Sequence, residues 1–239
     1  MNSAAQQPLQ VSAGGPRLWH AVHILVLAQV VLFCGTLFAQ DSATLVFSLD
    51  FPNSDPEHYS ISVQSDGRAK YESSGNISKD SDDKQTYQSE FKFSDATRAR
   101  IFELAAQAHY FEGKVDSGNK KLAFTGSKKL AYKDSQHSST AEYNYSQEPA
   151  IQQLTTLFQN VSATQEFGRR LSYFHRYQKL ALDDELKRME SEARAGELME
   201  LESVKPILQQ VYDDASVIKI VRARAMRIME MENTSPVSR

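Results

Sequence analysis

The sequence predicts an α+β fold, in which a mainly antiparallel sheet carries helices on one face and is followed by an all-helical C-terminal extension. Between residues 40 and 162, short segments that alternate apolar and polar residues are separated by turn signals and by two segments of helical period. After residue 162 the apolar residues recur with helical period throughout. Strands and helices in this order are typical of α+β domains.

The first 39 residues differ from the rest of the chain. They contain no Asp, Glu or Lys and a single Arg17, which precedes an apolar run over residues 21–39. A positive charge before an apolar run that ends in a small residue is typical of a secretory signal peptide, so we expect cleavage between Ala39 and Gln40. The alternative is an uncleaved membrane anchor, because a run of this length can just span a hydrocarbon core.

Either outcome predicts a protein exported to the periplasm or the extracellular space, or held outside the cytoplasm by a single-pass anchor. The single cysteine, Cys34, lies in the leader, and a cysteine-free remainder suits an oxidising compartment. The net charge of −3 excludes a strongly basic nucleic-acid-binding protein. We therefore expect no nucleic-acid partner, and contact with a membrane only through an uncleaved leader.

Residues 40–162 are expected to form the α+β domain. Asp66-Gly67 between two alternating segments predicts a hairpin, because that turn needs positive φ. Ser94 predicts the N-cap of a helix whose apolar residues recur up to residue 108, and Pro149 predicts the start of a second helix. Strands are predicted at residues 44–49, 59–63, 69–71, 87–93, 122–124, 130–132 and 141–145.

Residues 163–232 are expected to form the helical extension, and residues 233–239 a disordered tail. Ser162 with Gln165 has the pattern of a capping box, which predicts that a new helix starts there. Gly196 predicts the end of a helix, and Pro206 predicts the start of the next.

No cluster of residues in the sequence predicts catalysis or metal binding. The histidines after the leader lack a second His or Cys at ligand spacing, and the acidic segment 80–83 lacks the Gly and Glu of a calcium loop. Asp134 and His137 crowd one predicted turn, where bonding of Asp to its own backbone is the expectation. We expect no cofactor and no metal, and favour a protein without enzymatic activity.

Aromatic residues provide the candidate binding sites. Tyr143 and Tyr145 belong to a row of strand tyrosines, which combine apolar area with a hydroxyl group; packing of their rings under the helices is the alternative. Tyr173, Phe174 and Tyr177 lie on two adjoining apolar stripes, broader than one sheet contact requires. These stripes predict a protein partner or self-association through the helical extension, with packing against the α+β domain as the alternative.

Several segments resemble an uncharacterised exported family of environmental bacteria. The similar segments are HYSISVQSDGRAKYES, SDATRARIFELAAQAHYFEG, LAYKDS with AEYNYS, and EFGRRLSYFHRYQKLALDDELKRME, which span most of residues 50–190. The first part also resembles a wider bacterial domain of unknown function, in which a strand, a DG hairpin and a strand precede a helix and a second sheet segment. The resemblance implies export and the α+β fold, and it implies no activity, cofactor or catalytic residue.

These observations together predict an exported, non-enzymatic interaction or envelope-associated module. The alternative is a small exported hydrolase or ligand-binding protein, whose site is assembled only in three dimensions.

Overall fold

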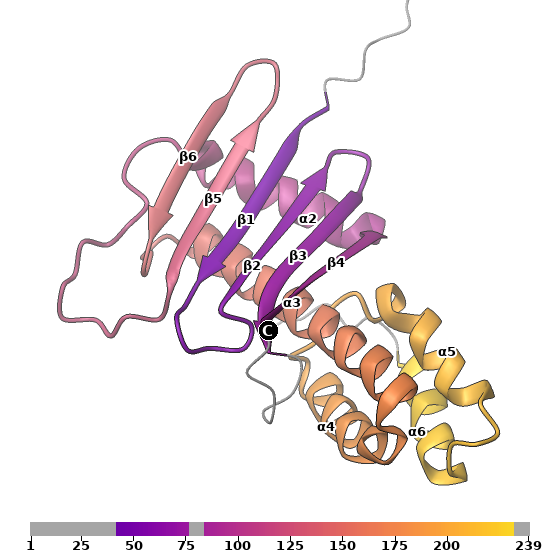
Figure 1. Ribbon diagram of the computed structural model, residues 1–239. Coiled ribbons are helices and arrows are strands. Elements are labelled where there is room, and N and C mark those ends of the chain that lie inside the picture. The colour runs from indigo at the N-terminus through magenta and orange to yellow at the C-terminus, as the bar shows by residue number, and fades with distance from the viewer. Residues whose placement is uncertain (1–41, 77–83, 232–239) are drawn as a thin grey trace, which may run out of the picture. The chain divides into compact units, whose positions relative to one another are not determined.

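The computed structural model describes residues 42–76 and 84–231, which belong to one compact unit, Asp41–Arg239 (Figure 1). The leader with its expected cleavage site at Ala39 and Gln40, the acidic segment before Lys84 and the predicted tail lie outside the described residues. Within the described part of the chain, no helix has the length and apolar character needed to cross a membrane.

The predicted α+β fold is confirmed. The described strands form one antiparallel sheet in the order β4-β3-β2-β1-β5-β6. Successive hairpins join β1 to β4, and β5 then pairs with the other side of β1, so that Phe47 lies opposite both Ile61 and Leu130. The strands are β1 (Thr44–Asp50), β2 (His58–Gln64), β3 (Arg68–Asn76), β4 (Lys84–Lys92), β5 (Ser127–Lys133) and β6 (Ser138–Tyr143).

Helices α2 (Asp95–Gln107) and α3 (Pro149–Tyr177) lie on one face of the sheet (Figure 1). The alternating inward side chains of the strands are buried against them. Phe47 stacks on Phe158 of α3 with ring centroids 5.2 Å apart, and Tyr132 contacts Phe102 of α2 edge-on at 6.5 Å. Burial of apolar side chains such as Phe47 and Phe158 stabilises the packing of the helices on this face.

Local signals in the sequence fix most element ends. Gly67 has φ +89° in the β2–β3 turn, as the Asp-Gly pair predicts. The Ser94 side chain accepts a hydrogen bond from the Thr97 amide and caps α2, and Pro149 occupies the first turn of α3. Gly196, with φ +75°, ends helix α4 (Leu182–Ala195).

Two predicted features are wrong. Residues 122–124 form no strand, because the Asn144 side chain takes backbone groups that a strand would pair: its oxygen accepts from the Thr125 amide, and its amide group donates to the Ala123 carbonyl. The expected helix start at Ser162 is also absent. The Ser162 and Gln165 side chains instead make tertiary hydrogen bonds, and no Pro or Gly interrupts α3 there.

Helix α3 runs through both parts of the fold. Its first half completes the hydrophobic core under the sheet up to Val161, and from Phe167 onward it belongs to a second core with the helices that follow. Figure 1 shows α3 continuing past the edge strand β4 into this helical extension. The extension contains η2 (Lys179–Ala181), α4 (Leu182–Ala195), η3 (Leu201–Val204), α5 (Lys205–Asp213) and α6 (Lys219–Met229).

Candidate binding cleft

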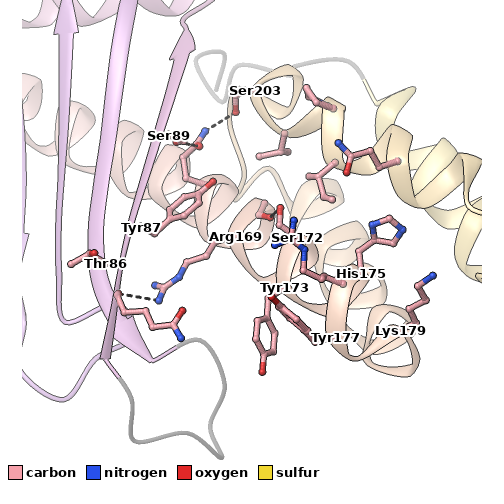
Figure 2. A pocket seen from close by; sticks show the side chains of 18 residues that line it. Thr86, Tyr87, Ser89, Arg169, Ser172, Tyr173, His175, Tyr177, Lys179 and Ser203 are labelled. Carbon is pink, nitrogen blue, oxygen red and sulfur yellow. Dashed lines mark hydrogen bonds between the residues drawn. The ribbon is translucent and has the colours of Figure 1, made fainter.

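A cleft of about 830 Å³ opens between strand β4 and the helical extension (Figure 2). One wall is β4, with Thr86, Tyr87 and Ser89 among its lining residues. The second half of α3, η3 and the start of α5 form the opposite wall. A volume of this size lies within the range of about 300–1,000 Å³ that is typical of ligand-binding pockets.

The β4 wall is an open sheet edge. Within the described sheet, β3 is the only strand that pairs with β4, and the two keep a regular register over nine residue pairs, from Arg68↔Lys92 to Asn76↔Lys84. The Phe93 amide donates to the Gly67 carbonyl across this pair at 2.9 Å. Backbone groups alternate in direction along a strand, so the N–H and C=O groups of Thr86, Gln88 and Glu90 point away from β3.

A long, regular edge without proline is uncommon, because such an edge is free to pair with another strand. Natural proteins usually protect an edge with a bulge, a proline, charged side chains or a covering segment. Strand β4 contains no proline, and its continuous register with β3 leaves no room for a bulge, although it carries the charged residues Glu90 and Lys92.

A buried polar cluster around Glu166 and Arg169 of α3 binds the sheet, and of these two residues Arg169 lines the cleft. Glu166 accepts hydrogen bonds from the Tyr71 hydroxyl at 2.8 Å and the Ser73 hydroxyl at 2.6 Å, and pairs with Arg169 at 3.3 Å. Arg169 also donates to the backbone carbonyls of Gly75 and Gln85. Burial, and then the neighbouring Glu166 carboxylate, raise the pKa of Tyr71 well above its ordinary value.

Two further contacts set the shape of the cleft. Gln165 bridges its walls, since its side chain accepts from the Ser89 hydroxyl at 2.7 Å and donates to the Ser203 hydroxyl at 2.7 Å. Gly168 lets η3 approach α3 closely, because a Cβ atom at this position would lie 2.6 Å from a methyl carbon of Val204. The cleft is therefore built into the packing of the two cores.

The lining of the cleft is cationic. None of the 18 described residues that line it is Asp or Glu, whereas Arg169, Arg176 and Lys179 are among them. Asp214 lies just outside and contacts the Lys179 amine at 2.6 Å and the His175 ring at 2.9 Å. Hydrogen bonds from Lys179 and Ser216, and then from His175, hold the pKa of the Asp214 carboxyl well below its ordinary value.

Arg176 differs from the other two cations of the lining. Arg169 is paired with Glu166, and Lys179 is paired with Asp214. Arg176 is exposed, packs over the Tyr177 ring at 5.9 Å, and forms no ion pair with any described residue.

The aromatic residues predicted from the helical stripes lie at or beside this cleft. Tyr173 and Tyr177 line it, with their ring centroids 5.1 Å apart, and 65% of Tyr177 is exposed. Figure 2 shows both rings on the α3 side of the cleft. Phe174 instead packs, partly buried, against the second hydrophobic core.

The two predicted strand tyrosines lie elsewhere. Tyr143 and Tyr145 line a separate pocket of about 220 Å³. Tyr143 is buried and its hydroxyl lies 2.6 Å from the Thr155 hydroxyl; burial raises its pKa to about 12. Tyr145 is more exposed, and its hydroxyl accepts a hydrogen bond from Gln152. The five predicted binding residues therefore do not form one site.

Asp134 and His137 make the contacts of a tight turn. Asp134 accepts from the backbone amides of Gln136 and His137 and from the Tyr132 hydroxyl, and its carboxylate lies 3.2 Å from the His137 ring. Burial alone would raise the pKa of the Asp134 carboxyl, but the hydrogen bonds from His137, Gln136 and Tyr132 together lower it to about 2. The His137 ring stacks on Tyr110 with centroids 4.0 Å apart.

Sequence patterns did not reveal most of the cleft. Thr86, Ser89 and Ser203 are short polar residues without a motif, and their role depends on which strand forms the sheet edge. No protein-family model matches the chain, and no curated protein matches it.

Proposed function

We propose that the protein is an exported, non-enzymatic interaction module that binds an extended segment of a partner protein along β4. The observation that carries the proposal is the open, regular edge of β4 along one wall of the cleft. A bound segment would add a seventh strand, and its backbone would pair with the outward N–H and C=O groups of Thr86, Gln88 and Glu90. Alternate side chains of the segment would enter the cleft.

Export is supported by the leader pattern before Gln40 and by the resemblance to exported bacterial proteins. The non-enzymatic character is supported by the contacts of Asp134 and His137, which are those of a turn. Groups of three or more His, Cys, Asp or Glu side chains with metal-binding geometry do not occur in the described residues.

Because the partner protein is not identified, selection of peptides from an unbiased library tests the proposal. An unbiased library of phage-displayed decapeptides is selected on the immobilised protein, and the enriched peptides are then measured against two variants. Gln88→Pro removes an outward edge donor, and Gln88→Ala keeps it. We expect peptides that bind the wild type and Gln88→Ala equally and bind Gln88→Pro at least tenfold more weakly.

A second measurement separates loss of pairing from a folding defect of the proline variant. Enriched peptides are resynthesised with N-methyl groups on alternate residues, in both registers. In a strand that pairs with β4, one register removes the pairing donors and abolishes binding, whereas the other leaves binding intact. The proposal would be overturned if both N-methylation registers weakened binding equally. It would also be overturned if the selection gave no edge-dependent peptide, that is, no peptide that binds Gln88→Pro more weakly than Gln88→Ala.

Self-association is a second candidate, and exposed apolar side chains at one end of the extension favour it. Leu180 is 91% exposed and Ile218 is 58% exposed. The hydrogen bond from Lys179 to Ser216 holds their two segments together at this end. Sedimentation velocity of the wild type and of Leu180→Ser tests it, with Leu122→Ser as an exposed control. A wild type that remains monomeric at high concentration would exclude this candidate.

A further inference from the structure

The charge around the cleft indicates which kind of segment it accepts. The protein as a whole is acidic, with 30 Asp and Glu residues against 27 Lys and Arg residues. The described lining of the cleft nevertheless contains cations and no carboxylate. Arg169 and Lys179 are paired with Glu166 and Asp214, so Arg176 supplies the positive charge of the lining that no described carboxylate neutralises. An unpaired charge in a groove favours ligands of the opposite charge and disfavours the others.

The cations are not evenly distributed along the cleft. His175, Arg176 and Lys179 belong to the C-terminal end of α3 and to η2, and Figure 2 shows His175 and Lys179 on the side away from Ser203. Near Ser203 the chain carries acidic residues instead. Glu200 accepts from the backbone amide and hydroxyl of Ser94, and Glu202 lines a neighbouring pocket.

Arg176 is the cation available to a ligand. The Arg169 guanidinium is buried and bound to Glu166 and two carbonyls, and Lys179 is held by Asp214. The exposed Arg176 guanidinium lies over the Tyr177 ring, which in turn contacts the Tyr173 ring. Such a guanidinium can pair with a carboxylate in a bidentate manner while the rings cover the adjoining apolar part of the ligand. The opposite end of the cleft is lined by the uncharged residues Ser89, Gln165 and Ser203, which hydrogen-bond to one another.

We infer that the segment bound along β4 is acidic at one end, and that its Asp or Glu side chains pair with Arg176 beside Tyr173 and Tyr177. The inference rests on the proposed function, because it names the chemistry of the same bound segment. The acidic end of the bound segment lies at the C-terminal end of α3, and its uncharged polar or apolar residues lie near Ser203.

The same peptide selection also tests this inference. The two readouts are the amino-acid sequences of the enriched peptides and the affinity of these peptides for variants that lack one positive charge. Arg176→Gln removes the cation, and because the residue is exposed and without an ion partner among the described residues, folding should not change. Arg194→Gln on α4 is the control for loss of one surface charge, since this side chain is 64% exposed, pairs with Glu190 and lies outside the cleft lining.

We expect enriched peptides with an excess of Asp and Glu at one end over the input library. Their affinity should fall about fivefold in Arg176→Gln and stay unchanged in Arg194→Gln, because one partly exposed ion pair contributes about this much. Binding should also weaken with added salt.

The failures of the two proposals are distinguishable. Edge-dependent peptides without an acidic excess, or with equal affinity for Arg176→Gln and the wild type, would overturn the inference and leave the proposed function standing. A selection without any peptide that depends on the β4 edge would overturn both.

Discussion

Replacement of Glu166 by glutamine is expected to destabilise the protein strongly. The Glu166 and Arg169 side chains of α3 are each almost fully buried, and both members of this ion pair also hydrogen-bond to the sheet. Glutamine retains an acceptor for the hydroxyls of Tyr71 and Ser73, but it leaves the Arg169 guanidinium buried without a counter-charge. Loss of one partner of a buried pair costs about 3–5 kcal/mol. The retained hydrogen bonds place this variant near the lower value.

Urea denaturation measures the loss. With a typical m-value of about 2 kcal/mol/M, a loss of about 3 kcal/mol lowers the unfolding midpoint by about 1.5 M. Glu103→Gln is the control, because its ion pair with Arg100 is exposed and such a pair contributes about 0.5 kcal/mol or less. Glu166→Gln combined with Arg169→Met should cost less than the sum of the single changes, since it removes both charges. A midpoint for Glu166→Gln equal to that of the control would refute this reasoning.

Four other outcomes are expected. Ser94→Ala should lose at least about 1 kcal/mol in urea denaturation, because α2 loses its N-cap and Glu200 loses the hydrogen bond from the Ser94 hydroxyl. Gly168→Ala should lose about 1–3 kcal/mol through the clash with Val204, and adding Val204→Ala should restore part of it; a single variant as stable as the wild type would contradict the close approach. The stabilisation from Asp214 is present at neutral pH, because its folded-state pKa is lowered, and it is lost as the pH falls below the ordinary value of 3.8. Thermal melting of Asp214→Asn should therefore differ from the wild type at pH 7 and converge with it in acid; a constant difference would exclude this origin. N-terminal sequencing of the exported protein should start at Gln40, whereas a retained leader would show an anchor.

The sequence was most informative where structure depends on neighbours along the chain. Strand alternation, the Asp-Gly turn, the Ser94 cap and the Gly196 stop are local signals, and the structure confirms each of them. The wrongly predicted strand at residues 122–124 shows the limit of such signals, because the side chain of Asn144, distant in sequence, hydrogen-bonds to the backbone of this segment and of the adjacent Thr125.

The cleft could not be predicted in this way. Whether β4 is a sheet edge depends on β5 pairing with β1, which is a contact between distant segments. The capping pattern at Ser162 and Gln165 was misleading for a related reason, since both side chains serve the contact between the sheet and the extension. Tyr173 and Tyr177 were identified because an exposed apolar stripe on a helix is visible in the sequence itself.

Amide hydrogen exchange on β4 tests the central claim most directly. Exchange at Thr86, Gln88 and Glu90 is measured by NMR, with and without an edge-dependent peptide recovered from the selection. Addition of a paired strand should slow exchange of these three outward amides at least tenfold, while the amides of helix α4, which lies outside the cleft lining, remain unchanged. Unaltered exchange on β4 under saturating peptide would show that the segment binds elsewhere and would contradict strand addition.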